Sequence, residues 1–335
     1  GFLYEKKNEE SRAEKAYFEA LRINEKDSDV WYNLSRLFLK TREFEKSEDA
    51  ILKTIQYDEN HSSAWNDLGL MYADRGKYKR ALSYFKKAIK IDEKETIYML
   101  NLACTYDDLE DYQNAEKTYY RVLKLDKDYV DAWYNLGVLY QNKIQNYAMA
   151  ISSFQQVLKL NNKDIDALNH LGNIYQNNLD KVEDAIQTYH RAIKINTDDY
   201  LAFYNLSFLL IAKQNNWNEA ESLFKSSKID QDFQDTYALL KMLFEYHNQN
   251  LGLAKSYLLN ALDYIGNTLH DDSKDDWWRT GAIVSKMGYG QHFTEVLEES
   301  GYDIIMRPYY EAIKAYDEKD ADLYLNTVAA EVREP

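Results

Sequence analysis

The six histidines and the single cysteine are the side chains best suited to catalysis or metal binding. The histidines are widely separated, without the HExxH spacing of zinc hydrolases, at positions His61, His170, His190, His247, His270 and His292. The sequence also lacks the G-x-S-x-G nucleophile turn, the Walker loop and the G-x-G-x-x-G dinucleotide loop. It therefore predicts a protein that is not an enzyme and that has no cofactor and no bound metal.

Two weaker candidates for chemistry have simpler interpretations. The run His270-Asp271-Asp272 has metal-binding side chains, but it falls in a polar link where a solvated loop is favoured. Cys104 has no basic partner nearby in the sequence, so a packing role is expected. One cysteine excludes an internal disulfide, which fits a reducing compartment and predicts a cytoplasmic protein.

Composition limits both the fold and the partners. The chain has 335 residues, with only 11 Gly and 2 Pro, which predicts nearly continuous helix. It carries 41 basic and 56 acidic residues, a net charge of −15, which disfavours nucleic acids and anionic membranes and favours basic partners. The apolar stretch around Phe208 to Ala212 is too short to span a bilayer.

The sequence contains an internal repeat with a period of 34 or 35 residues. Trp31, Trp65, Met99 and Trp133 lie 34 residues apart, and Leu168 and Phe203 follow at steps of 35. A second column repeats with the same period: Ala13, Ser47, Ala81, Ala115, Ala150, Ala185 and Ala220, each followed four residues later by Tyr17, Ile51, Phe85, Tyr119, Phe154, Tyr189 or Phe224. Spacings of three and four place apolar side chains on one helical face, so each period predicts an antiparallel helical hairpin.

The columns resemble the tetratricopeptide repeat family, whose pattern is W-x2-L-G-x2-Y followed by A-x3-F. The resemblance implies an all-α fold, a right-handed α-α superhelix in which stacked hairpins complete one another's core. The family's proline near the end of the second helix is missing here; Glu59, Glu93 and Lys127 stand near its place.

Numbering each unit with the Trp at position four defines the expected organisation. A partial repeat at 1–27 precedes six units, 28–61, 62–95, 96–129, 130–164, 165–199 and 200–233. Units four to six carry one extra residue, which we expect in a lengthened turn between the helices. Residues 234–268 form a degenerate repeat, because Lys241 occupies the position that is small elsewhere.

Residues 269–335 lose the repeat phase and are expected to form a helical cap over the open end of the array. A polar link at 271–276 precedes expected helices at 274–286, 291–300, 303–317 and 320–333. A second recognition surface around Trp277 or Trp278 is the alternative to simple capping.

The family resemblance places the first helix of each hairpin on a concave surface, with positions two, five, six and nine facing the groove. Position six holds Asn33, Asp67, Asn101, Asn135, His170 and Asn205. This series is similar to the Asn ladder of O-linked N-acetylglucosamine transferase and kinesin light chains, which implies that the amides hold the backbone of an extended peptide. Alternatively, the amides bond only to neighbouring helices and set the stacking of repeats.

Positions five and two supply the remaining candidates for peptide binding. Position five contributes Tyr32, Asn66, Leu100, Tyr134, Asn169 and Tyr204, and tyrosine is enriched at binding hot spots. Position two contributes Asp29, Asp131 and Asp166, which favour ligands that carry Lys or Arg. Packing of the tyrosines across the hairpin and a solvated acidic face are the competing interpretations.

The sequence thus predicts a scaffold for protein–protein interaction that binds a protein or peptide in its groove. Arg36 is the only basic residue at the groove positions, which disfavours the carboxylate clamp of chaperone-binding relatives. Because Gly1 falls in mid-repeat, we also expect a piece of a longer protein. The alternative function is the sensor or oligomerisation arm of a multidomain regulator, such as a bacterial signalling or defence protein, with its catalytic domain elsewhere. The oligomeric state stays open.

Overall fold

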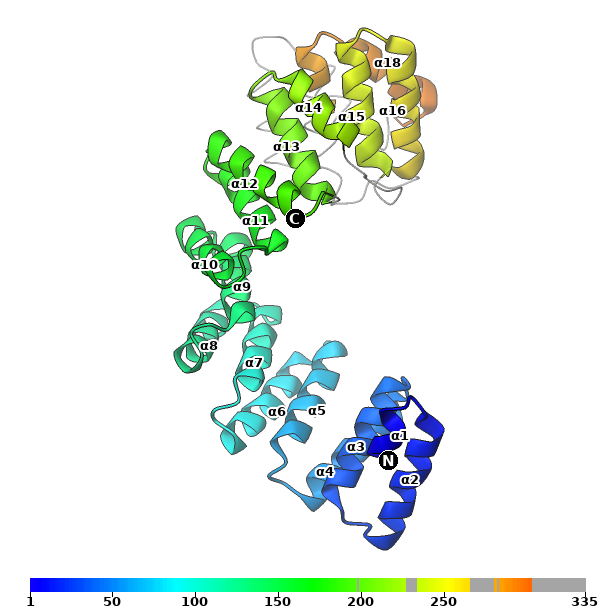
Figure 1. Ribbon diagram of the computed structural model, residues 1–335, viewed down its shortest axis with the longest axis vertical. Coiled ribbons are helices and arrows are strands. Elements are labelled where there is room, and N and C mark those ends of the chain that lie inside the picture. The colour runs from blue at the N-terminus through cyan, green and yellow to red at the C-terminus, as the bar shows by residue number, and fades with distance from the viewer. Residues whose placement is uncertain (198, 227–233, 266–279, 282, 303–335) are drawn as a thin grey trace. The chain divides into compact units, whose positions relative to one another are not determined.

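The structure, a computed structural model, describes residues 1–197, 199–226, 234–265, 280, 281 and 283–302. All regular secondary structure in these residues is helical, and the prediction of an all-α repeat fold is confirmed. The helices follow one another as antiparallel pairs (Figure 1). The chain divides into two compact units, Gly1–His170 and Leu171–Pro335.

Each hairpin of the first unit joins a first helix to a second helix through a short turn. The pairs are α1 (Phe2–Glu5) and α2 (Glu10–Ile23), α3 (Ser28–Lys40) and α4 (Phe44–Tyr57), α5 (Ser62–Asp74) and α6 (Tyr78–Ile91), α7 (Thr96–Asp108) and α8 (Tyr112–Leu125), and α9 (Val130–Leu139) with the π-helical turn η1 (Tyr140–Ile144) and α10 (Tyr147–Leu160). The boundary between the two units falls within α11 (Ile165–Asn173).

Each hairpin closes where a small residue of the first helix meets a ring of the second. A methyl group added at Gly137 would lie 2.7 Å from the ring of Phe154, closer than packed carbon atoms approach. The same addition would lie 2.6 Å from the Phe85 ring at Gly69 and 2.4 Å from the Tyr189 ring at Gly172. The three rings are completely buried. We call Gly69, Gly137 and Gly172 the small column, because a larger side chain at these positions would overlap the rings.

The turn inside each hairpin is closed by one residue in the left-handed conformation. These residues are Asn8, Arg42, Gly76, Glu110, Gln145, Asp180, Asn215 and Gln249. Only Gly76 is a glycine, although glycine is the residue that adopts positive φ without steric cost. The other turns therefore contain a mild backbone strain that the packing of the hairpin sustains.

In two of the three longer units, the extra residue lies in the first helix and not in the turn between the helices. In 130–164 and 165–199 the expected longer turn is wrong, because the residue widens the end of the first helix into π-helical turns, η1 and η2 (Ile174–Asn178). A π-helical turn accommodates one more residue than an α turn. In 200–233 the residue does lie in the turn, between α13 (Tyr200–Ala212) and α14 (Trp217–Ser226).

One hydrogen bond survives this change of length. The Tyr72 carbonyl accepts from the backbone N–H of Lys77, five residues later, at 2.8 Å. The Tyr140 carbonyl accepts from Asn146, six residues later, at 2.9 Å. The hairpin is thus pinned at the same tyrosine whether the unit has the standard length or one residue more.

Tryptophans at position four connect each hairpin to the preceding link. The indole Nε1–H donates to the backbone carbonyl six residues earlier: Trp31 to Glu25 at 2.7 Å, Trp65 to Glu59 at 2.9 Å and Trp133 to Lys127 at 2.9 Å. A half-buried indole needs such a partner, and the bond fixes the angle at which the chain enters the next first helix.

The second unit continues the hairpins with α12 (Val182–Ile195), α13, α14, α15 (Gln234–His247) and α16 (Leu251–Ile265). In α15 and α16, Leu240, Phe244, Ala254 and Leu258 are buried. Lys241 extends over the ring of Phe224, with its ammonium 5.2 Å from the ring centroid. The small position therefore accepts a lysine here by directing it onto an aromatic face.

Of the expected cap, the structure describes a helical stretch at 283–286 and α18 (Gly290–Ser300), which matches the helix expected at 291–300. Tyr246 of α15 lies beside it, with its hydroxyl 2.9 Å from His292 Nδ1. The expected helices at 303–317 and 320–333, the link at 271–276, and Trp277 and Trp278 lie outside the described residues.

Candidate functional site

The candidate binding residues of the first unit lie on first helices that are neighbours in space. Helix α5 packs against α7, and α7 packs against α9. Figure 1 shows α5, α7 and α9 following one another on one side of this unit, with α6, α8 and α10 on the other. Side chains at positions five and six of consecutive repeats are therefore close enough to interact.

Hydrogen bonds join these positions from repeat to repeat. We call the following residues the polar seam: Tyr32, Asn66, Asp67, Asn101, Tyr134, Asn135 and His170. In three of its links a position-six side chain bonds to position five of the preceding repeat. Side chains at position six therefore take part in joining one repeat to the next.

At the first link, the carboxylate of Asp67 is fully engaged. The Tyr32 hydroxyl donates to Oδ2 at 2.9 Å, and the Asn66 amide donates to Oδ1 at 3.2 Å. Burial raises the pKa of Asp67, although the two hydrogen bonds and the charges of Arg36 and His61 act in the opposite direction. Burial likewise raises the pKa of Tyr32, and the Asp67 carboxylate adds to that effect.

At the second link, the Asn101 amide donates to Asn66 Oδ1 at 2.9 Å. Asn66 is only 6% exposed, so this bond satisfies a carbonyl that water does not reach. The Oδ1 atom of Asn101 has no hydrogen-bond partner among the described residues, and Asn101 is half-buried. The Nδ2 group of Asn101 is therefore hydrogen-bonded within the protein, whereas its Oδ1 atom can accept a hydrogen bond from a ligand.

At the third link, position five is Leu100, and the bond moves to position nine. The Asn135 amide donates to Cys104 Sγ at 3.5 Å, and the Tyr119 hydroxyl donates to the same sulfur at 3.4 Å. Burial raises the pKa of the Cys104 thiol, so the sulfur remains protonated near neutrality and acts as a weak acceptor. Asn135 Oδ1 is free of hydrogen bonds within the described part of the chain.

At the fourth link, His170 is held by both of its ring nitrogens. The Tyr134 hydroxyl lies 3.1 Å from Nε2, and Gln141 Oε1 lies 2.9 Å from Nδ1. The ring of Phe154 stacks on the imidazole at 4.8 Å between centroids. Burial lowers the pKa of His170, while Asp166 and Asp164 act weakly in the opposite direction.

Three candidates of the first unit are open to solvent. Asp131 and Asp166 at position two are exposed, as is Asp29, whose Oδ1 lies 3.9 Å from His61 Nε2. Asn33 is half-buried, and its side chain forms no hydrogen bond with any residue that the structure describes. The accessible polar groups of this surface therefore include three carboxylates, the amides of Asn33, Asn101 and Asn135, and the exposed Arg36 at position nine.

Among the other position-five and position-six candidates, Asn169, Tyr204 and Asn205, only Tyr204 is buried. Tyr204, in the second unit, is 3% exposed and packs on Phe208 at 4.6 Å between ring centroids, so it does not lie on an open surface. Asn205 and Asn169 are half-buried. The sequence placed Asn66 at position five without predicting its bond to Asn101, gave Cys104 only a packing role, and did not indicate Gln141 as a member of the network.

The described residues assemble neither a metal-binding cluster nor a membrane-spanning helix. Those residues contain no group of three or more His, Cys, Asp or Glu side chains arranged to hold a metal ion. None of their helices combines the length and apolar character required to cross a bilayer.

The hairpins, the small column and the seam define a helical-repeat protein. Sequence profiles of the tetratricopeptide repeat match residues 28–61, 62–95, 97–129, 130–164 and 167–199, about half of the chain in total. The chain belongs to the tetratricopeptide repeat family. Such repeats typically act as non-catalytic scaffolds for protein interaction.

Solved structures show the same fold at low sequence identity. A tetratricopeptide repeat protein from Parabacteroides merdae is 16% identical, with a TM-score of 0.51 over 78% of this chain and 98% of that one. The C-terminal part of a repeat protein from Cytophaga hutchinsonii is 16% identical, with a TM-score of 0.52 over 61% and 83%. The pilF protein of Pseudomonas aeruginosa is 20% identical, with a TM-score of 0.50 over 60% and 90%. No curated protein matches the chain.

Proposed function

We propose that the first-helix surface of residues 28–170 binds an extended peptide segment of a protein partner. The observation that carries this proposal is the half-committed state of two amides in the polar seam. Asn101 and Asn135 each use an amide N–H to join repeats, while their Oδ1 atoms remain unbonded among the described residues. Each oxygen is then available to accept a backbone N–H from a guest chain.

The packing of the helices supports the choice of surface. Helices on the inner side of a curved stack approach one another more closely than those on the outer side. The contacts from α5 to α7 and from α7 to α9 therefore favour the first helices as the inner side of this unit. Repeat arrays commonly bind partners on such a surface.

Within this surface, hydrogen bonding favours some candidates over others. Asn33 has no bond to lose and Asn101 and Asn135 have an open oxygen, so these three amides are proposed to contact the peptide backbone. Asp67 and His170 already have hydrogen bonds on both polar atoms, so their proposed role is to position the neighbouring Tyr32 and Tyr134.

The exposed carboxylates favour a basic ligand. Asp131 and Asp166 lie at position two of consecutive repeats, and Arg36, at position nine, is the only Lys or Arg at positions two, five, six and nine of the six units. We therefore propose that Lys or Arg side chains of the peptide pair with these two aspartates, which adds selectivity and speeds association more than it adds affinity.

The test begins with peptides selected on the immobilised chain from a random displayed library, labelled and measured by fluorescence anisotropy. Asn33→Ala combined with Asn135→Ala should weaken binding about thirtyfold, since two hydrogen bonds of roughly 1 kcal/mol each are lost. Gln113→Ala, an exposed amide on the second helix α8, is the matched control. Unchanged affinity in the double variant would refute the role of the amides.

Salt provides an independent arm. The selected peptides should be rich in Lys and Arg, and their affinity should fall as ionic strength rises, because the screening length shortens from about 10 Å at 0.1 M salt to about 3 Å at 1 M. Binding that is insensitive to salt would remove the proposed preference for basic ligands while leaving the role of the amides to be judged by the variants.

A further inference from the structure

Helix α6 has a charge opposite to that of the chain as a whole. It contains the five cations Lys79, Arg80, Lys86, Lys87 and Lys90 and no carboxylate, within a chain of net charge −15. All five side chains are exposed, and none lies within ion-pairing distance of a carboxylate in the described residues. Unneutralised cations on an acidic protein form a local site for an anion.

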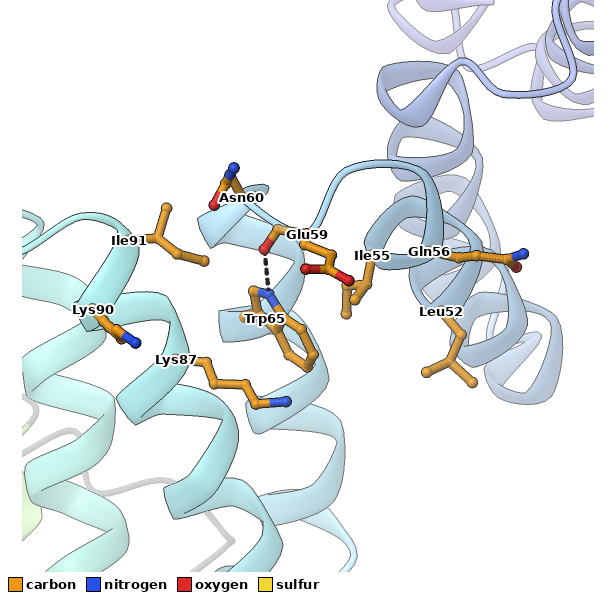
Figure 2. Close-up of a pocket in the computed structure, with 9 residues that line it drawn as sticks. All are labelled: Leu52, Ile55, Gln56, Glu59, Asn60, Trp65, Lys87, Lys90 and Ile91. Atoms are coloured by element: carbon orange, nitrogen blue, oxygen red, sulfur yellow. Dashed lines mark hydrogen bonds between the residues drawn. The ribbon is translucent and has the colours of Figure 1, made fainter.

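A cleft of about 940 Å³ opens beside this helix, between α4 and α6. Figure 2 shows Leu52 and Ile55 on the α4 side, Trp65 on α5 at the centre, and Lys87 and Lys90 on the α6 side. The cleft is lined by second helices, by the link between repeats and by Trp65 of the first helix α5, and it shares no residue with the polar seam. It is therefore distinct from the polar seam on the first helices.

The apolar part of the cleft is partly open to water. Leu52 is 47% exposed and Ile91 is 37% exposed, while Ile55 at 8% forms the buried end. Trp65 is half-buried, and its indole N–H is already used by the Glu59 carbonyl, so its ring offers the cleft contact area and no hydrogen bond. Exposed apolar side chains around a tryptophan are typical of a binding pocket for an apolar anchor.

Positively charged side chains lie on the α6 side of this apolar pocket. The ammonium of Lys87 lies 3.9 Å from the centroid of the Trp65 ring, and Lys90 lies one turn further along α6 (Figure 2). Glu59 is the only carboxylate among the lining residues, so the cations prevail. A cation already resting on an aromatic face can pair with an incoming carboxylate while keeping that contact.

From this complementarity we infer that the cleft between α4 and α6 binds an acidic peptide segment that inserts one large apolar side chain. The apolar side chain packs against Leu52, Ile55 and Trp65, and neighbouring Asp or Glu residues of the segment pair with Lys87 and Lys90. The array then carries two separate surfaces of opposite preference, an acidic one on the first helices and a basic one on the second helices.

The experiment uses labelled synthetic peptides in which one Phe is flanked by Glu and Asp, titrated with the full chain and followed by anisotropy. Lys87→Gln combined with Lys90→Gln should weaken binding about tenfold, the effect of losing two charge pairs beside an apolar anchor. Lys117→Gln with Lys124→Gln on α8 removes the same charge at exposed positions outside the cleft and should change affinity less than about twofold.

A second pair of probes tests the apolar anchor. Leu52→Ser alters an exposed side chain rather than the core and should also weaken binding, and a peptide with Ala in place of Phe should bind about tenfold less tightly. The proposal is overturned if both lysine pairs have the same effect or if a Lys-flanked peptide binds equally well. Preferential binding of a single-stranded oligonucleotide, or self-association of the chain that requires Lys87 and Lys90, would overturn it too. Because the Asn33 and Asn135 variants leave this cleft intact, the two proposals fail separately.

Discussion

The carboxamide of Asn101 donates to Asn66 Oδ1 at 2.9 Å, across the boundary between two repeats. This bond shows how a residue can serve stability and recognition together. An amide has two N–H groups and an acceptor, and only one N–H is needed to join the hairpins. The remaining groups are held in a fixed orientation by the first bond, which lowers the entropy lost when a ligand binds.

The same bond predicts a measurable contribution to stability. Asn101→Ala leaves the buried Asn66 oxygen without its donor and should lower the free energy of unfolding by about 1–3 kcal/mol. Asn66→Ala combined with Asn101→Ala should cost less than the sum of the single variants, because each single variant leaves a partner unsatisfied. Additive losses in a denaturant double-mutant cycle would show that the two amides do not interact.

The ring of Phe154 predicts that Gly137 tolerates no larger side chain. Gly137→Ala places a methyl carbon 2.7 Å from that ring and should lower the thermal midpoint, with a loss of about 1–3 kcal/mol from overpacking. Gly252→Ala on α16 is the matched control, since nothing lies within 4 Å of the added carbon. That variant should be neutral or stabilising by up to about 1 kcal/mol. Equal losses in both variants would contradict the steric explanation.

The left-handed turn residues predict effects of opposite sign. Gly76→Ala meets no neighbouring atom but puts a side chain at φ 68°, and should destabilise by about 1–2 kcal/mol. Glu110→Gly, at φ 59° in the equivalent turn, removes that strain and should be neutral to stabilising. The comparison requires thermal melts of both variants at one pH. Stabilisation by Gly76→Ala would be incompatible with strain in these turns.

His170 predicts a dependence of stability on pH. Its folded pKa lies below the unfolded value of 6.5 because the imidazole is buried, so its contribution is complete above that value and is lost as pH falls through the folded pKa. His170→Gln should therefore reduce the fall in melting temperature between about pH 7.5 and pH 5. An identical fall in the variant and the original chain would show that this imidazole titrates as it does in the unfolded state.

Much of the fold followed from the sequence because repetition amplifies weak signals. A single Gly137 or Ala115 indicates little about the fold by itself. Columns of such residues, repeated up to seven times, specify the helices, their pairing and the contact of small residues with aromatic rings between them. The π-helical turns were not predictable, since a ten-residue step from Tyr140 to Ala150 is satisfied equally by a longer turn or by a wider helix end. Local hydrogen bonding decides between them, and the sequence does not encode it in residue spacing.

The candidate site was predicted by position but not by partner. Position six pointed to Asn101 and Asn135, which lie on the first helices α7 and α9, and their role in binding a peptide stays a prediction. It could not show that Asp67 and His170 are saturated, because their partners lie a full repeat away and depend on how hairpins stack. The cleft between α4 and α6 could not be predicted from the sequence for a related reason. Leu52, Trp65 and Lys87 belong to three different helices, and only folding brings them together.

The tyrosine carbonyl that accepts from the start of the second helix has a broader consequence. Since the pin from Tyr72 to Lys77 has its counterpart from Tyr140 to Asn146, a hairpin can gain a residue without losing its closure. Length variation is thus absorbed inside the module rather than passed on to the next one. Evolution, or a protein engineer, can accordingly exchange modules of unequal length within such an array and leave the downstream interfaces in phase.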